Sequence, residues 1–226
     1  STGERTLMFK AQLTGPHVFG ISPHGSHVVY WKDGRFNVYE LESGASRPLG
    51  AGSPVSFVNA EYDHPGPRPS YGLAGYTSDG KAAVVHHRYD LWLMPLDGSA
   101  PKNLTQGVGA KNEIRFRYLR PEPVDPTEPR AAGPRGSIDL SKPILLSAYG
   151  EYTKKAGFYE LAGDRLKELV FEDASFGPPE KAMKADRYLF TRQTFVEHPD
   201  LRVSGPNFGD ARRITDANPH QHEYVW

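Results

Sequence analysis

Short apolar runs alternate with polar positions along most of the chain, and turns rich in glycine and aspartate separate them. The first two strands are predicted at 28–31 and 36–41, with the turn Asp33-Gly34 between them. An Asp-Gly pair between two apolar runs is a strong short-range signal for a β-hairpin. Because no long run with helical spacing interrupts this pattern, the chain is predicted to be all-β.

The same strand pattern occurs twice in nearly the same form. A Ser-Pro-His-Gly turn at 22–25 leads into the first hairpin, and a Thr-Ser-Asp-Gly turn at 77–80 leads into a second one. The strands of this second hairpin are predicted at 82–86 and 91–95. A unit of short strands that recurs roughly every 45 to 60 residues is typical of a β-propeller, whose blades are small antiparallel sheets.

Four blade-like units are predicted along the chain, at about 15–50, 71–105, 113–171 and 186–215. The segment 5–13 is predicted to be a lone strand, the outer strand of a preceding blade. Propellers close with about four to eight blades, so four could close alone. The lone strand predicted at 5–13 instead favours a larger ring of about seven or eight blades, of which these antiparallel units would be part.

A proline-rich segment interrupts the third unit. Prolines recur through 120–136. Proline lacks the backbone N–H that a central strand or a helix interior needs. This segment is therefore predicted to be an exposed, semi-rigid loop.

Charge and composition exclude several classes of partner and chemistry. The chain has 226 residues, with 27 Lys and Arg against 27 Asp and Glu, so its formal net charge is zero. This balance gives no electrostatic reason to expect nucleic acid or an anionic membrane as a partner. No apolar run approaches the roughly 18 residues that a membrane span requires. Cysteine is absent, so the sequence holds no disulfide and no thiolate nucleophile or metal ligand.

Several stretches in the second half of the chain resemble the prolyl oligopeptidase family of serine peptidases. These stretches are Arg-Tyr-Asp-Leu-Trp at 88–92, Leu-Asp-Gly at 96–98, Lys-Asn-Leu-Thr at 102–105, Thr-Lys-Lys-Ala-Gly-Phe-Tyr at 153–159, the run 190–201, and Ile-Thr-Asp-Ala-Asn-Pro at 214–219 with Tyr-Val-Trp at 224–226. The likeness extends from about residue 76 to the end of the sequence.

The resemblance implies two domains with different roles. In that family an N-terminal propeller caps a C-terminal α/β-hydrolase domain, which carries a Ser, Asp and His triad. It implies that 1–217 form a propeller segment and that 218–226 lead toward a hydrolase domain absent from the chain. The expected function is non-catalytic: the segment would gate and position peptide substrates for that domain. A periplasmic or secreted location is favoured over a cytoplasmic one.

Two alternatives are kept open. The first is a stand-alone propeller that binds a protein or a peptide and has no enzymatic activity. The second is a small metal-dependent hydrolase that uses His220, His222 and Glu223, because an H-x-H on a strand places both rings on one face. An incomplete ring would also leave open strand edges, so self-association through them is expected.

Candidate catalytic residues do not emerge from the sequence. A hydrolase nucleophile elbow requires G-x-S-x-G, which does not occur, and Ser22 in Gly-Ile-Ser-Pro-His-Gly is interpreted as a turn residue. The adjacent His86 and His87 point to opposite faces of a strand and are not expected to share a metal. We therefore assign no catalytic, cofactor-binding or metal-binding residue and expect no cofactor.

Aromatic residues recur at matching places in the predicted blades, among them Trp31, Trp92 and Phe158. They are predicted to pack between sheets rather than to form a ligand platform. The run 115–118, in which basic and aromatic residues alternate, is interpreted as a strand with one face in water.

Overall fold

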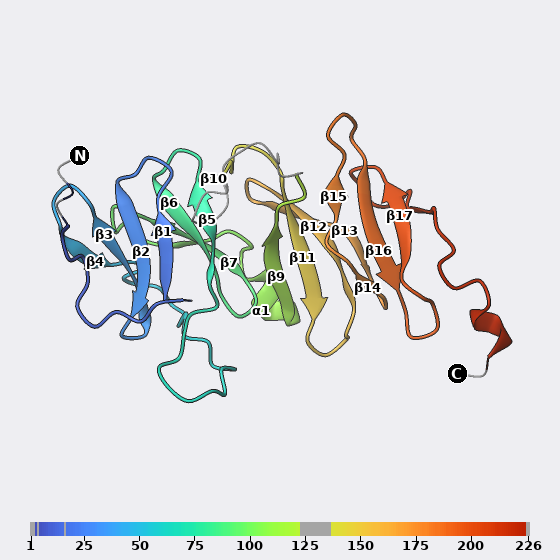
Figure 1. The fold of residues 1–226 in the computed structure, drawn as a ribbon, viewed down its shortest axis with the longest axis horizontal. Helices are drawn as coiled ribbons and strands as arrows, with labels where there is room; N and C mark the ends of the chain where they lie inside the picture. Colours follow the sequence, from blue (N-terminus) through green and yellow to red (C-terminus); the bar gives the residue numbers. More distant parts are fainter. Residues whose placement is uncertain (1–2, 4, 16, 123–136, 225–226) are drawn as a thin grey trace. The chain divides into compact units, whose positions relative to one another are not determined.

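The computed structural model describes residues 3, 5–15, 17–122 and 137–224. Within these ranges the chain forms four sheets of mostly antiparallel strands (Figure 1). The helical elements described are the short α1 (Val108–Asn112) and the 3-10 helix η1 (Gln221–Glu223). The all-β class and the four blade-like units are thereby confirmed. No helix in these ranges is long and apolar enough to cross a bilayer.

The chain divides into two compact units. The first takes in the described residues through Leu104 together with 137–140, and the second takes in 105–122 and 141–224. Each unit contains two of the four sheets, and each is described by itself below.

The first sheet contains β1 (Val18–Ile21), β2 (His27–Lys32), β3 (Arg35–Glu40) and β4 (Ser46–Pro48) in sequence order. The predicted hairpin is confirmed, with Lys32 opposite Arg35 at its end. Asp33 and Gly34 both adopt positive φ, at 52° and 71°. Two successive residues in this region are what a tight two-residue hairpin turn requires.

The second sheet contains β5 (Leu73–Thr77), β6 (Ala82–His86), β7 (Leu91–Pro95) and β8 (Lys102–Asn103), and it gains β10 (Ser137–Ile138) at the edge of β5. The bounds of β6 and β7 match the predicted strands. β10 was not predicted: it pairs in parallel with β5, Ile138 opposite Thr77, and Ile138 is buried.

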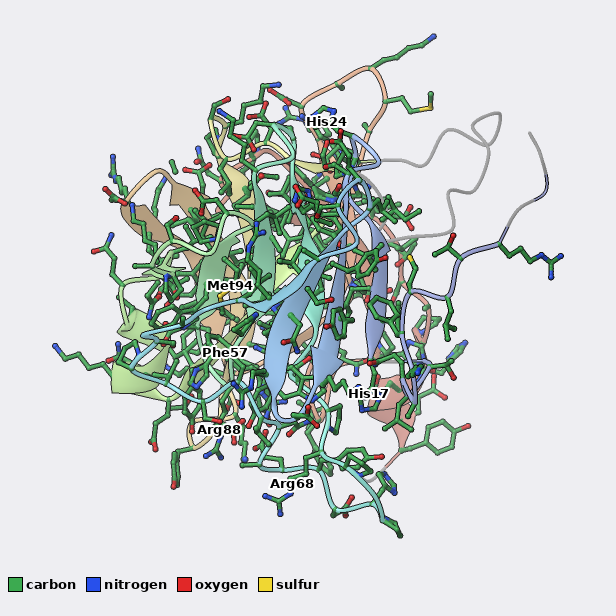
Figure 2. All side chains as sticks on the ribbon, turned by 90° about the vertical axis from the view of Figure 1, so that its left-hand side faces the viewer. His17, His24, Phe57, Arg68, Arg88 and Met94 are labelled. Carbon is green, nitrogen blue, oxygen red and sulfur yellow. The ribbon has the colours of Figure 1, made fainter. Side chains whose placement is uncertain are left out.

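Apolar side chains from both sheets form the core of the first unit. Trp31, Phe36 and Trp92 are almost fully buried in it. Phe57, from the loop between the sheets, packs edge-on against Phe36 and Trp92 with ring centroids 5.8 and 5.7 Å apart. Figure 2 labels Phe57 and Met94 of this core.

The N-terminal segment differs from the prediction, because 5–13 contain no strand. Ala11 has a φ of 48°, which interrupts an extended backbone. Phe9 instead packs on Tyr30 and Tyr39, with ring centroids 4.4 and 5.3 Å away. The segment therefore adds to the first sheet through side-chain packing rather than through a backbone ladder.

The third sheet lies in the second unit and has the order β13-β12-β11-β9. Its strands are β9 (Ile114–Leu119), β11 (Ile144–Gly150), β12 (Ala156–Ala162) and β13 (Arg165–Glu172). They fall where the sequence placed the third unit. Most of the proline-rich loop predicted at 120–136 lies outside the described residues.

The fourth sheet contains β14 (Ser175–Phe176), β15 (Glu180–Lys181), β16 (Tyr188–Gln193), β17 (Asp200–Ser204) and β18 (Arg212–Arg213). Its order is β14-β16-β17-β18, with β15 also paired to β16. Phe158 of the third sheet packs against Phe190 and Phe208, at ring-centroid distances of 5.9 and 4.7 Å. This phenylalanine cluster holds the two sheets together.

Candidate binding pocket

A polar cavity of about 430 Å³ lies beside the fourth sheet. Its walls come from β16, β17 and β18, from the hairpin loop 194–199, and from the chain after β18 (orange to red in Figure 1). All of these elements belong to the second unit. The volume is within the range of a small-ligand site.

Strand register brings charged side chains to one face of the fourth sheet. Arg192 lies opposite Asp200, and Arg202 lies opposite Arg213. Asp200 and Arg202 are two residues apart on β17, so they share a face. Three guanidinium groups and a carboxylate from three strands thus line one wall of the cavity.

Arg192 is held by two carboxylates. Its Nε lies 2.7 Å from Oε1 of Glu172, and its Nη1 also pairs with Glu197 in the hairpin loop. The hydrogen bond with Glu172 is the main reason that the pKa of Arg192 is raised above its ordinary value. Glu197 is thereby fixed at the cavity with its charge compensated.

Asp200 ties the chain after β18 back to β17. Its carboxylate accepts hydrogen bonds from the Thr215 hydroxyl at 2.7 Å and the Ala217 N–H at 2.9 Å, and it pairs with Arg213 at 2.8 Å. These donors, the Thr215 hydroxyl first, lower the pKa of Asp200. Arg213 also pairs with Asp216. We call this arrangement the Asp200 clasp.

A second attachment uses the amide of Gln221. Its Oε1 accepts the N–H of His198 at 3.2 Å, and its Nε2 donates to the carbonyl of Val196 at 2.7 Å. The side-chain amide of Gln221 thus bonds to both an N–H and a carbonyl of one loop, as the backbone of a neighbouring strand would. The hairpin loop and the C-terminal segment, which both line the cavity, are therefore joined directly to each other.

Arg202 differs from the other two arginines of the cavity. Its Nε is buried and makes no hydrogen bond, and the side chain has no ion pair with any carboxylate that the structure describes. A buried polar group without a partner is uncommon and costly, so it calls for an explanation.

The metal hypothesis placed His220 and His222 on a strand, and this placement was wrong. They lie at the 3-10 helix η1, where strand alternation does not apply. The imidazole of His220 is hydrogen-bonded to the Glu223 carboxylate, with Nδ1 and Oε1 2.7 Å apart. Within the described ranges no group of three His, Asp or Glu side chains has the geometry of a metal site.

The remaining sequence candidates have structural surroundings. Ser22 is a buried turn residue, as predicted: its Oγ accepts the N–H groups of Ser26 and His27. His87 packs edge-on against Phe57. The aromatic residues predicted to pack between sheets do so, since Trp31, Trp92 and Phe158 are buried. Arg115 pairs with Glu151 beside the buried Phe116, which confirms a strand with one polar face.

Sequence reasoning missed Arg202, Asp200 and the cavity. The run 190–201 drew attention only through its family resemblance. The sequence did contain a signal for a polar site here. Asp200 and Arg202 would share one face of a strand, where apolar residues are expected if that face packs against a neighbouring sheet.

The four sheets define the class of protein: an all-β chain built of propeller blades. A comparison with protein-family models finds no match. A search of curated proteins finds no relative either.

Solved structures similar to the chain include TolB proteins and proteases. A putative TolB from Agrobacterium tumefaciens is 12% identical over 89% of this chain and 62% of its own, with a TM-score of 0.46. A puromycin-hydrolyzing peptidase of Mycobacterium tuberculosis is 12% identical over 88% of this chain and 31% of its own, with a TM-score of 0.42. The β-propeller domain of the Trilobed protease from Pyrococcus furiosus is 11% identical over 88% of this chain and 84% of its own, with a TM-score of 0.28.

The chain therefore spans less than two thirds of the length of the TolB structure and about a third of the peptidase. At this level of similarity the comparison carries no information on activity. The class of fold rests on the sheets themselves.

Proposed function

We propose that the chain is the non-catalytic propeller segment of a serine peptidase and positions peptides for an α/β-hydrolase domain that follows it. One observation carries the proposal. The two most specific stretches of family resemblance, 190–201 and 214–219, both supply walls of the same cavity. The two stretches, which precede and follow β18, thus meet at one cavity.

The surroundings of the cavity suit a peptide. Its interior is polar, whereas Phe195 and Val196 at the tip of the hairpin loop are 94% and 64% exposed. Exposed apolar side chains beside a polar pocket are typical of surfaces that bind another chain. A peptide could place polar groups in the cavity and an apolar side chain against the loop tip.

The cavity offers binding rather than covalent chemistry. Among the described residues that line it there is no serine or threonine. Apart from Arg202, the carboxylates and guanidinium groups that line it are engaged in ion pairs, and the described lining residues give them no serine or threonine to activate. A binding and positioning role therefore fits these residues better than hydrolysis.

The coding sequence after Trp226 tests the proposal. A G-x-S-x-G elbow followed by an aspartate and a histidine is the expected finding. A stop codon directly after Trp226 would contradict the proposal and favour the stand-alone binding propeller. As a second test, the purified chain is incubated with chromogenic peptides, and we expect no hydrolysis. Cleavage by this chain alone would also contradict it.

A further inference from the structure

We infer that Arg202 is the carboxylate-binding residue of the cavity and that the ligand is a short peptide bearing one carboxylate group. This inference rests on the proposed function, because it names the chemistry by which the same cavity would hold a peptide. It begins from the difference between Arg202 and its two neighbours.

Arg192 and Arg213 are already neutralised. Arg192 pairs with Glu172 and Glu197, and Arg213 pairs with Asp200 and Asp216. Each of the two guanidinium groups therefore has its positive charge compensated by two acids of the chain. The guanidinium of Arg202 has no such partner among the residues described, although its Nε is buried.

The position of Arg202 suits its unpaired N–H groups to binding a ligand in the cavity. It lies on the central strand pair of the fourth sheet, opposite Arg213, and lines the cavity. The guanidinium of arginine is a planar fork of N–H donors. Such a fork matches the two oxygens of a carboxylate better than a flexible ammonium does.

The charges that line the cavity select the kind of anion. Glu197, Asp200 and Asp216 balance Arg192, Arg202 and Arg213 there. Arg202 is the guanidinium of this set without an ion pair among the described residues, so it offers a ligand one positive charge. Phosphate carries about −1.5 to −2 at neutral pH, so a carboxylate with a single charge is the better match.

The rim of the cavity adds a preference for an apolar residue beside the carboxylate. Val196 and Tyr224 line the cavity and are 64% and 67% exposed, with Phe195 next to them. Aromatic side chains at the edge of a polar pocket provide contact area at low entropic cost. A peptide end with a large apolar side chain fits this combination.

Calorimetric titration of the intact chain with four probes tests the inference. The probes are acetyl-Ala-Phe-Leu with a free C-terminal carboxylate, the same tripeptide as its amide, acetyl-Ala-Glu-Leu amide with a side-chain carboxylate, and inorganic phosphate. Each is titrated into the unmodified chain, into Arg202→Gln and into Arg212→Gln. Arg212 is the matched control. It is exposed on β18, next to Arg213, and it lies opposite Val203 rather than Arg202.

The free acid is expected to bind more tightly than its amide. Arg202→Gln should weaken binding of the acid about 10- to 100-fold, as expected for hydrogen bonds to a charged group. It should leave the amide unchanged, and Arg212→Gln should change neither. Circular dichroism of the variants shows whether the fold is kept. Equal binding of the side-chain acid would also support a carboxylate site and would show that it accepts a terminal and a side-chain carboxylate alike.

Other results overturn the inference. If Arg202→Gln binds the acid as well as the unmodified chain does, Arg202 is not the carboxylate ligand. Tighter binding of phosphate than of the acid has the same consequence. If acid and amide bind equally and ignore both substitutions, the carboxylate inference fails while peptide positioning stands. If no peptide binds up to millimolar concentration, peptide positioning at this cavity fails as well.

Discussion

Two hydroxyl groups explain why the turn sequence is repeated in the first unit. The Oγ of Ser22 accepts the N–H of His27 at 3.1 Å, and the Oγ1 of Thr77 accepts the N–H of Ala82 at 3.0 Å. Both bonds span five residues. In each turn a glycine three residues after the hydroxyl, Gly25 or Gly80, has a positive φ near 70°. The repeat in the sequence is thus a repeat of one turn geometry.

A third hydroxyl, on Tyr76, completes an irregular strand pair. The register of β1 and β2 shifts between Val18 and Ile21, so Val29 lacks a regular partner there. The Tyr76 hydroxyl accepts the N–H of Val29 and donates to the carbonyl of Gly20, both at 2.9 Å. Burial raises the pKa of Tyr76 to about 12, which keeps the donor in place.

Tyr76→Phe is expected to destabilise the chain by about 1–3 kcal/mol, because a buried N–H and a partly buried carbonyl lose their partner. Urea unfolding measures the change, with Tyr152→Phe as the control, since Tyr152 is 78% exposed. Equal unfolding midpoints for Tyr76→Phe and the unmodified chain would contradict the bridging role.

The raised pKa of Tyr76 also predicts a dependence on alkaline pH. The neutral phenol contributes stability that is fully present below the unfolded pKa of about 10 and is lost as pH rises toward 12. Tyr76→Phe should therefore lose less stability than the unmodified chain between these pH values. Thermal unfolding at a series of alkaline pH values measures this difference. Equal losses of stability in both proteins would show that the pKa of Tyr76 is not raised in the fold.

At the scale of elements, the stretch 153–159 has a structural explanation besides its family resemblance. A Cβ at Gly157 would lie 1.9 Å from the carbonyl oxygen of Val170, so β12 and β13 approach too closely for any other residue. Phe158 joins the phenylalanine cluster, and the Tyr159 hydroxyl donates to Glu168. Each residue of the Gly-Phe-Tyr run therefore meets a packing demand of this sheet.

Gly157→Ala is expected to cost about 1–3 kcal/mol or more, because the two strands must separate to admit the methyl group. Gly209→Ala is the matched control: its nearest atom would be 3.9 Å away, and Gly209 has no positive φ. Chemical unfolding of both variants measures the effect. Equal stabilities would show that the strands adjust at little cost.

The Asp200 clasp predicts an acid-sensitive segment. Because the pKa of Asp200 is lowered in the fold, its contribution is present above the ordinary carboxyl range and is lost as pH falls below about 4. Asp200→Asn should release 214–224 already at neutral pH. Hydrogen exchange followed by mass spectrometry measures the protection of this segment, with the 90% exposed Asp63→Asn as the control. Unchanged protection in Asp200→Asn would argue against the clasp.

For the whole molecule, strand alternation and turn residues were sufficient to place all four sheets. They were insufficient for β10, because two residues paired with a strand far earlier in the chain carry no periodic signal. The cavity was beyond sequence reasoning for a related reason. Its charged wall depends on which residue of β16 or β18 lies opposite Asp200 and Arg202, and register is fixed only by the folded sheet. A net charge of zero also gives no sign that an arginine lining the cavity, Arg202, has no ion pair with a described carboxylate.

Self-association through strand edges stays a prediction. The longest edge strand described is β13, which carries Arg165, Lys167 and Glu168. Charges of this kind discourage pairing with a second chain. We expect association to be weak and to increase when salt screens these charges. Sedimentation velocity at low and high salt measures it, and a single monomer species over a hundred-fold range of concentration would contradict the prediction.

The return of β10 to the first unit has a consequence for dividing the protein. The chain leaves this unit after Leu104 and comes back to supply Ile138, which is 1% exposed against β5. No single cut of the chain can therefore separate the two units intact. A shortened protein that ends at Leu104 would expose the edge of β5, whereas adding 137–140 through a short artificial linker would restore it. The two units of this protein are therefore defined by their contacts and do not correspond to two continuous stretches of the chain.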